Sequence, residues 1–146
     1  MVRDLMLHLK SLLWCLNKDR KRYNLRVIID CLNARHVPES IRGTPLGKNL
    51  NYLIDQLSAS GSLAVLLNTI KRISQSKQRL KTTSGNIELG QYLKTIKTLD
   101  SIPPGSFGVV SFLGESIYGL FYLDNRGILE KKVMSDQVEI ILGTRI

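Results

Sequence analysis

Residues 107–134 read FGVVSFLGESIYGLFYLDNRGILEKKVM, and this stretch decides the class of fold. β-branched and aromatic runs at 107–114, 118–124 and 127–134 are separated by short polar segments, and a fourth run follows at 137–143. Apolar runs of this length between turn residues are typical of strands. Four such strands joined by short turns predict an antiparallel meander.

The turn before the third run is the clearest of the connections. Asp124, Asn125, Arg126 and Gly127 fit a hairpin turn, because Asn125 and Gly127 tolerate a positive φ. A sheet of about forty residues has too small a core to be stable alone. We therefore expect it to pack on a helix, on the preceding part of the chain, or on a second chain.

Upstream of the strands, apolar residues recur at three- and four-residue steps, which is the spacing of one helix face. The pattern predicts helices over 4–17 and 23–32, a single turn around Ile41, and two further helices that begin at Pro45 and after Ser62. Thr44 is suited to cap the first of these two, Gly61 to end it in a left-handed conformation, and Ser62 to cap the second. The core leucines are expected to include Leu50, Leu53, Leu63 and Leu67.

The fold class predicted from these patterns is α+β, with an N-terminal helical bundle of four to five helices followed by a small antiparallel β-meander. We expect a helical bundle domain over 1–75, a linker with a short helix over 76–104, and the sheet over 105–146. The short helix is placed at 87–99, where Pro103, Pro104 and Gly105 stop it soon afterwards.

The excess of positive charge is confined to the first part of the chain. Residues 1–80 hold 14 basic and 5 acidic side chains, whereas residues 81–146 hold seven of each, so the whole formal charge of +9 belongs to the first part. Such an imbalance favours an anionic partner: nucleic acid, a membrane surface or an acidic protein face.

Most of this charge lies in two clusters, and we predict that they bind the partner. The predicted partner-binding residues are Lys18, Arg20, Lys21, Arg22, Arg26, Lys71 and Arg72. Nucleic-acid binding would add Lys77, Arg79 and Lys81, with an affinity that falls steeply as salt is raised. A solvated helix face is the alternative without a binding role.

The sequence contains no recognisable catalytic set. His8 and His36 are the only histidines and neither lies in a nucleophile motif, the glycines form no phosphate-binding loop, and the acidic residues show no metal-ligand spacing. Cys15 and Cys31 are expected to be core thiols in a reducing compartment. We therefore expect no enzymatic activity, cofactor or metal, and no apolar stretch is long enough for a signal peptide or membrane span. A soluble, cytoplasmic protein is predicted.

Residues 19–74, which begin DRKRYNLRVIIDCLNARHVPESIRG (19–43), resemble the effector-associated domains of bacterial conflict and signalling proteins. The likeness lies in a helix with a short turn at Leu32–His36, a break at Pro38 and Ile41, and two helices separated by Ser60-Gly61. Those domains are small, death-domain-like helical adaptors that couple partners to effectors by like-with-like association. The resemblance implies the same adaptor role for this chain.

Residues 107–143 are more weakly similar to the opening strands of trypsin-like peptidase domains, which often follow such adaptors. Where that family carries its catalytic histidine, this chain has Glu130, Lys131, Lys132 and Val133. The resemblance implies an inactive derivative. The alternative, which we favour, is an unrelated sheet that serves for dimerisation or docking.

The sequence thus predicts a non-enzymatic adaptor of a bacterial signalling or conflict system that works through protein–protein association. The expected partner is an effector or a like domain, and homo-oligomers are consistent with it. The rival prediction is a basic nucleic-acid-binding protein that uses the clusters Lys18–Arg26 and Lys71–Lys81.

Overall fold

The chain folds into five helices followed by a five-stranded antiparallel sheet, so the α+β class is confirmed. The structure is a computed structural model that describes residues 2–18, 22–58, 61–75, 87–113, 116–123, 127–134 and 136–141. The elements are α1 (Val2–Lys18), α2 (Arg22–Ala34), α3 (Glu39–Arg42), α4 (Pro45–Ser58), α5 (Ser62–Gln75), β1 (Tyr92–Thr95), β2 (Phe107–Leu113), β3 (Ile117–Leu123), β4 (Gly127–Val133) and β5 (Val138–Ile141).

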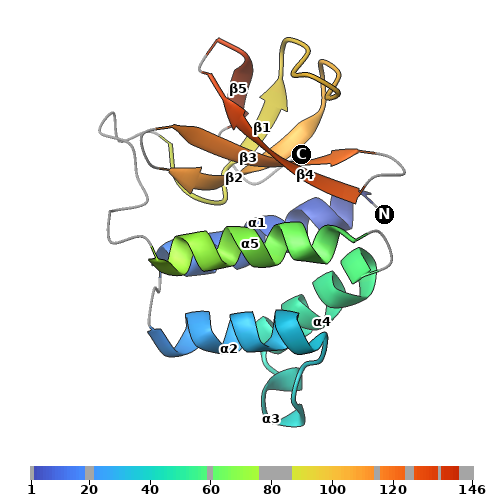
Figure 1. The fold of residues 1–146 in the computed structure, drawn as a ribbon, viewed down its shortest axis with the longest axis vertical. Helices are drawn as coiled ribbons and strands as arrows, with labels where there is room; N and C mark the ends of the chain where they lie inside the picture. The colour runs from blue at the N-terminus through green and yellow to red at the C-terminus, as the bar shows by residue number, and fades with distance from the viewer. Residues whose placement is uncertain are drawn as a thin grey trace.

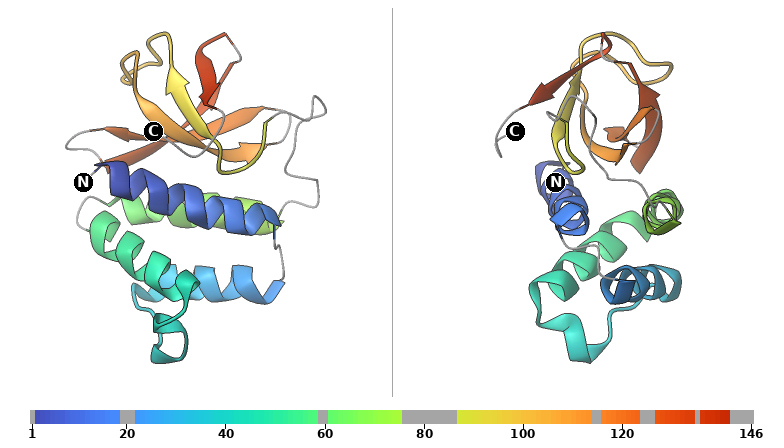
Figure 2. Two further views of the ribbon diagram at one scale, coloured as in Figure 1. Left: turned by 180° about the vertical axis from the view of Figure 1, so that it is seen from behind. Right: turned by 90° about the vertical axis from the view of Figure 1, so that its left-hand side faces the viewer.

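The elements are stacked in layers. The sheet lies on α1 and α5, which run side by side beneath it, and α2 and α4 lie below that pair with α3 at the far end (Figures 1 and 2). One apolar core continues from the lowest helices into the sheet, where it includes Tyr92, Val109, Leu120 and Ile128. The sheet was expected to pack on a helix, on the preceding part of the chain, or on a second chain. The structure shows that it packs on the helical bundle.

The helices begin and end largely where the sequence predicts. Thr44 Oγ1 accepts a hydrogen bond from the backbone N–H of Gly47 at 3.0 Å, which is the geometry of a helix N-cap. Gly61 has a φ of 76°, the left-handed conformation that favours glycine. Ser62 is itself the first residue of α5, and its hydroxyl accepts a hydrogen bond from the backbone N–H of Ile128 at 2.9 Å. This bond joins the start of α5 to β4.

The sheet differs from the predicted meander in its order, which is β4-β3-β2-β1-β5. Strands β2, β3 and β4 pair in sequence order, but β5 pairs with β1, so that Val138 lies opposite Thr95. The prediction of a four-stranded meander is therefore wrong in two respects: β5 does not pair with β4, and a further strand, β1, pairs with β2. In the turn before β4, Gly127 has the expected positive φ of 76°, while Asp124, Asn125 and Arg126 lie outside the described residues.

The predicted helix over 87–99 is wrong, because β1 occupies its centre. Tyr92 and Leu93 are adjacent and both fully buried, Tyr92 in the core shared with the helices and Leu93 in a second apolar cluster. Successive side chains that point to opposite faces define a strand. A strand buried on both faces lacks the polar alternation that would have identified it in the sequence.

The core leucines follow the prediction closely. Leu50, Leu53 and Leu63 are buried, and Leu67 is half-buried against the same core. Among the described residues, the helices include none with the length and apolarity that a membrane span requires.

Candidate functional site

The described members of the predicted basic set lie on α2 and α5, and the directions of these helices bring the start of α2 and the end of α5 to one end of the bundle. The end of α1, the start of α2 and the end of α5 lie together at the left of Figure 1, and the reverse view in Figure 2 agrees. Arg26 and Lys71 are exposed on α2 and α5. Arg20 and Lys21, and the side chains of Lys18 and Arg22, lie outside the described part of the chain.

Arg72 is engaged within the chain, unlike its neighbour Lys71. Its Nη2 atom lies 2.8 Å from Oε1 of Glu130 on β4, and the two side chains are 40% and 13% exposed. The guanidinium also lies over the rings of Phe112 and Tyr118, at 5.4 and 5.1 Å from their centroids. An arginine held by a carboxylate and two rings has little freedom to meet an external partner.

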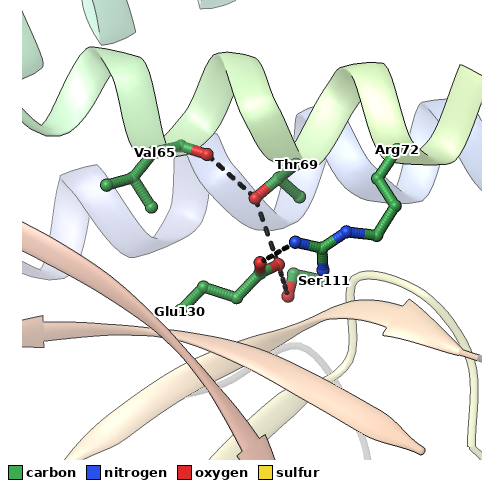
Figure 3. Close-up of polar contacts among 5 residues, drawn as sticks. All are labelled: Val65, Thr69, Arg72, Ser111 and Glu130. Carbon is green, nitrogen blue, oxygen red and sulfur yellow. Dashed lines mark hydrogen bonds and ion pairs between the residues drawn. The ribbon is translucent and has the colours of Figure 1, made fainter.

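Glu130 gathers a polar cluster between α5 and the sheet, drawn in Figure 3. The hydroxyl of Thr69 shares its proton between Glu130 Oε2 at 3.1 Å and the backbone oxygen of Val65 at 3.0 Å, and the hydroxyl of Ser111 donates to Glu130 Oε2 at 2.9 Å. Thr69 and Ser111 are both fully buried. With Arg72 on the other oxygen, the carboxylate is held from α5 and β2, so the cluster fastens the helix to the sheet.

An apolar groove of about 700 Å³ lies between α1, α2 and the first turns of α4. Its floor includes the buried side chains of Leu16 and Ile28. The three helices around it are seen together in the left view of Figure 2. The groove is lined by His8, Ser11, Cys15, Leu16, Ile28, Thr44, Pro45, Leu46, Lys48 and Asn49.

His8 has a fixed position at one wall of this groove. Its Nδ1 lies 2.6 Å from Oδ1 of Asn49, and its ring stacks on Tyr52 with the centroids 3.9 Å apart. Burial raises the pKa of the Tyr52 hydroxyl, and the negative charge of Asp4 raises it further. His8 is itself half-buried.

Cys15, His8 and Asn49 are the residue types of a thiol hydrolase, and all three line the groove. Cys15 and His8 are seven residues apart on α1, which corresponds to about 10 Å along a helix. A thiol and the imidazole that activates it need to be within hydrogen-bond reach. The groove therefore does not assemble this catalytic pair, and it is better suited to binding.

The two cysteines differ in exposure. Cys31 is buried as expected, and desolvation followed by the charge of Asp30 raises the pKa of its thiol. Cys15 is exposed, so its prediction as a core thiol is wrong. Both are free thiols. In the described residues, no three His, Cys, Asp or Glu side chains are grouped so that they could hold a metal ion.

Sequence reasoning missed both the groove and the Glu130 cluster. The cluster joins Thr69 to a glutamate 61 residues later, and no local pattern reveals a contact at that separation. The groove depends on how three helices diverge, which apolar spacing leaves undetermined. None of the family models, curated proteins and solved structures compared with this chain matches it.

Proposed function

We propose that this protein is a non-enzymatic adaptor whose helical bundle binds an acidic face of a partner protein. The observation that supports the proposal is that the end of α1, the start of α2 and the end of α5 lie at one end of the bundle (Figure 1), called the basic end because Arg26 and Lys71 belong to α2 and α5 there. Arg26 and Lys71 are exposed there, so their charges are available to a partner.

The sheet supports this role by holding the bundle. It covers α1 and α5 and leaves α2 and α4 in the opposite layer, so the lower layer and the basic end are the parts free of the sheet. A death-domain-like arrangement, a bacterial signalling or conflict system and a cytoplasmic location belong to the same proposal, as implied by the resemblance of residues 19–74. Charge complementarity of this kind sets the rate and specificity of association and weakens with salt.

Nucleic-acid binding is the second candidate, and the same convergence favours it. Lys77, Arg79 and Lys81 follow the end of α5 in the sequence, directly after the end that meets the start of α2. The basic side chains would neutralise phosphates of the nucleic acid without contacting particular bases. The affinity for nucleic acid would then fall steeply as salt is raised.

Fluorescence anisotropy with three labelled probes separates the candidates: a poly-glutamate peptide, a single-stranded oligonucleotide and a duplex. The adaptor proposal predicts that the peptide binds at low salt and that the double variant Arg26→Glu/Lys71→Glu weakens this binding by about tenfold or more. The matched control is Lys97→Glu/Lys132→Glu, which changes the net charge equally at exposed positions of the sheet domain.

The outcomes are distinct. Tight oligonucleotide binding with a steep salt dependence, and no peptide binding, would replace the proposal by the nucleic-acid candidate. Equal loss in the control variant would mean that net charge, and not the basic end, attracts the probe. Absence of binding to all three probes at low salt would remove both candidates.

A further inference from the structure

One face of α1 is left uncovered by the rest of the molecule. Leu7, Ser11 and Cys15 are exposed and follow one another at four-residue steps, so they form a line along the helix. Leu7 is 48% exposed, and in the described residues only Ile96 and Met134 are comparably exposed large apolar side chains. α1 therefore presents an apolar projection at one end of this line.

The other end of the same line opens into the apolar groove. Ser11 and Cys15 both line that groove, together with Leu46 of α4 and the buried Ile28 of α2. A projection and a recess thus lie on one face of one helix, about one to two turns apart. A surface that carries both is complementary to itself, which is the requirement for a two-fold symmetric contact.

We propose that a second copy of this chain occupies the groove through its own α1, which lies antiparallel to the first. A two-fold axis at Ser11 places Leu7, four residues before it, opposite Cys15, four residues after it, in the other copy. In this register each Leu7 enters the part of the groove that Cys15 lines. The small side chain of Ser11 at the axis lets the two helices approach closely.

Charge supports the same register. Asp4 is exposed one turn before Leu7, and the two-fold axis places it opposite position 18 of the other copy. That position is the last residue of α1 and is a lysine, so the register sets an acidic position against a basic one. A parallel arrangement would instead set Asp4 against Asp4, where like charges repel. The dimer goes beyond the proposed function, because it forms without the acidic partner.

Disulfide trapping tests the register directly. Leu7→Cys is expected to give a covalent dimer on mild oxidation, through the native Cys15 of the second copy. Two residues at position 7 would be eight residues of helix rise apart, about 12 Å, which is too far for a disulfide between them. The double variant Leu7→Cys/Cys15→Ser should therefore stay uncrosslinked, as should Asn68→Cys, an exposed position on α5.

Sedimentation of the full chain tests the contact without any new cysteine. The wild-type protein is expected to associate to a dimer, and Leu7→Asp to raise the dissociation constant by about tenfold or more. Leu7 is half exposed, so the variant and the wild-type protein are expected to share one thermal midpoint at concentrations where both are monomeric.

Three results would overturn the proposal: a Leu7→Cys protein that stays uncrosslinked, crosslinking that persists when Cys15 is replaced, or dimerisation unaffected by Leu7→Asp. Loss of the dimer in Leu7→Asp with unchanged binding of the poly-glutamate probe would support it and leave the adaptor proposal standing. Arg26→Glu/Lys71→Glu should lose binding of the poly-glutamate probe and still dimerise. This result would show that the basic end and the α1 contact are different surfaces, and it would also support the α1 contact.

Discussion

Glu130 is the residue on which the junction between the helices and the sheet depends most. Its carboxylate accepts hydrogen bonds from two hydroxyls and forms an ion pair with one arginine, and these three partner side chains come from α5 and β2, neither of which pairs with β4. A buried polar cluster stabilises a fold only while all of its members are satisfied. The contribution of the cluster to stability is therefore measured best by replacing Glu130.

Glu130→Ala should lower the free energy of unfolding by about 1–3 kcal/mol, because the buried hydroxyl of Ser111 loses its acceptor and that of Thr69 keeps only the Val65 carbonyl. Arg72 is partly exposed, so water compensates part of its loss. Urea unfolding followed by circular dichroism measures the change. Glu139→Ala, an exposed position on β5, is the matched control and should be near neutral; equal effects at both positions would contradict a special role for the cluster.

Asp100 provides a prediction about pH. Lys131 lies 2.6 Å from its carboxylate, and the hydrogen bond and positive charge lower the pKa of Asp100. A carboxyl whose pKa is lower in the folded state stabilises the fold above its unfolded pKa, and this contribution is lost as the pH falls through the folded pKa. The group is exposed, so the contribution is small.

An NMR titration of the Asp100 carboxyl in wild-type protein and in Lys131→Gln checks this shift. The midpoint should rise in the variant toward the ordinary value for aspartate, and the acid side of the stability profile should become slightly flatter. Lys97→Gln, which removes the partner of Asp136, is the control and should leave the Asp100 midpoint unchanged. An identical midpoint in Lys131→Gln would rule out the ion pair in solution.

At the scale of elements, Gly90, two residues before β1, lies directly against the backbone of α1 at Trp14. A Cβ at this position would lie 2.8 Å from the backbone nitrogen of Trp14, and the φ of 88° is itself unfavourable for any other residue. Both facts require glycine here. The position fixes how near β1 lies to α1.

Gly90→Ala should therefore cost roughly 2–4 kcal/mol of stability, from backbone strain together with overpacking. Gly105→Ala is the matched comparison, because its φ is 84° and a Cβ there would meet nothing within 4 Å. Its cost should be about 1 kcal/mol, from strain alone. Thermal or urea unfolding gives both values, and equal costs would show that the close approach to α1 does not exist in solution.

The elements differ in how far the sequence determines them. The bundle helices could be predicted because each has an amphipathic face and local stop and start residues such as Thr44 and Gly61. β1 could not, because Tyr92 and Leu93 are buried on opposite faces of the sheet. The pairing of β5 with β1 joins residues more than forty positions apart in the sequence. The Thr69–Glu130 contact between α5 and the sheet does the same.

The candidate site was predictable only in its composition. The sequence shows that basic residues cluster near 18–26 and after 70, but not that the helix ends converge or that Arg72 turns toward Glu130. The convergence of the helix ends and the Arg72–Glu130 contact both depend on the directions of the helices. The spacing of residues along the chain does not determine these directions.

At the scale of the whole molecule, the helices and the sheet share one continuous apolar core. The chain should therefore unfold in a single transition, with the fluorescence of Trp14 and the helical circular dichroism signal changing together. A fragment of residues 1–75 should be much less stable than the full chain, because the sides of α1 and α5 that face the sheet would be exposed to water. Two separated transitions, or a fragment as stable as the full chain, would contradict this prediction.

We propose that the protein works by binding a protein partner at its basic end. Site-specific photo-crosslinking inside the native cells tests it most directly, with a photo-reactive amino acid placed either at Arg26 or at Asn68, both exposed. The account predicts an adduct with an acidic segment of another protein from position 26, its loss when Lys71 is changed to Glu, and no such adduct from position 68. Adducts with nucleic acid, or equal protein adducts from both positions, would contradict it.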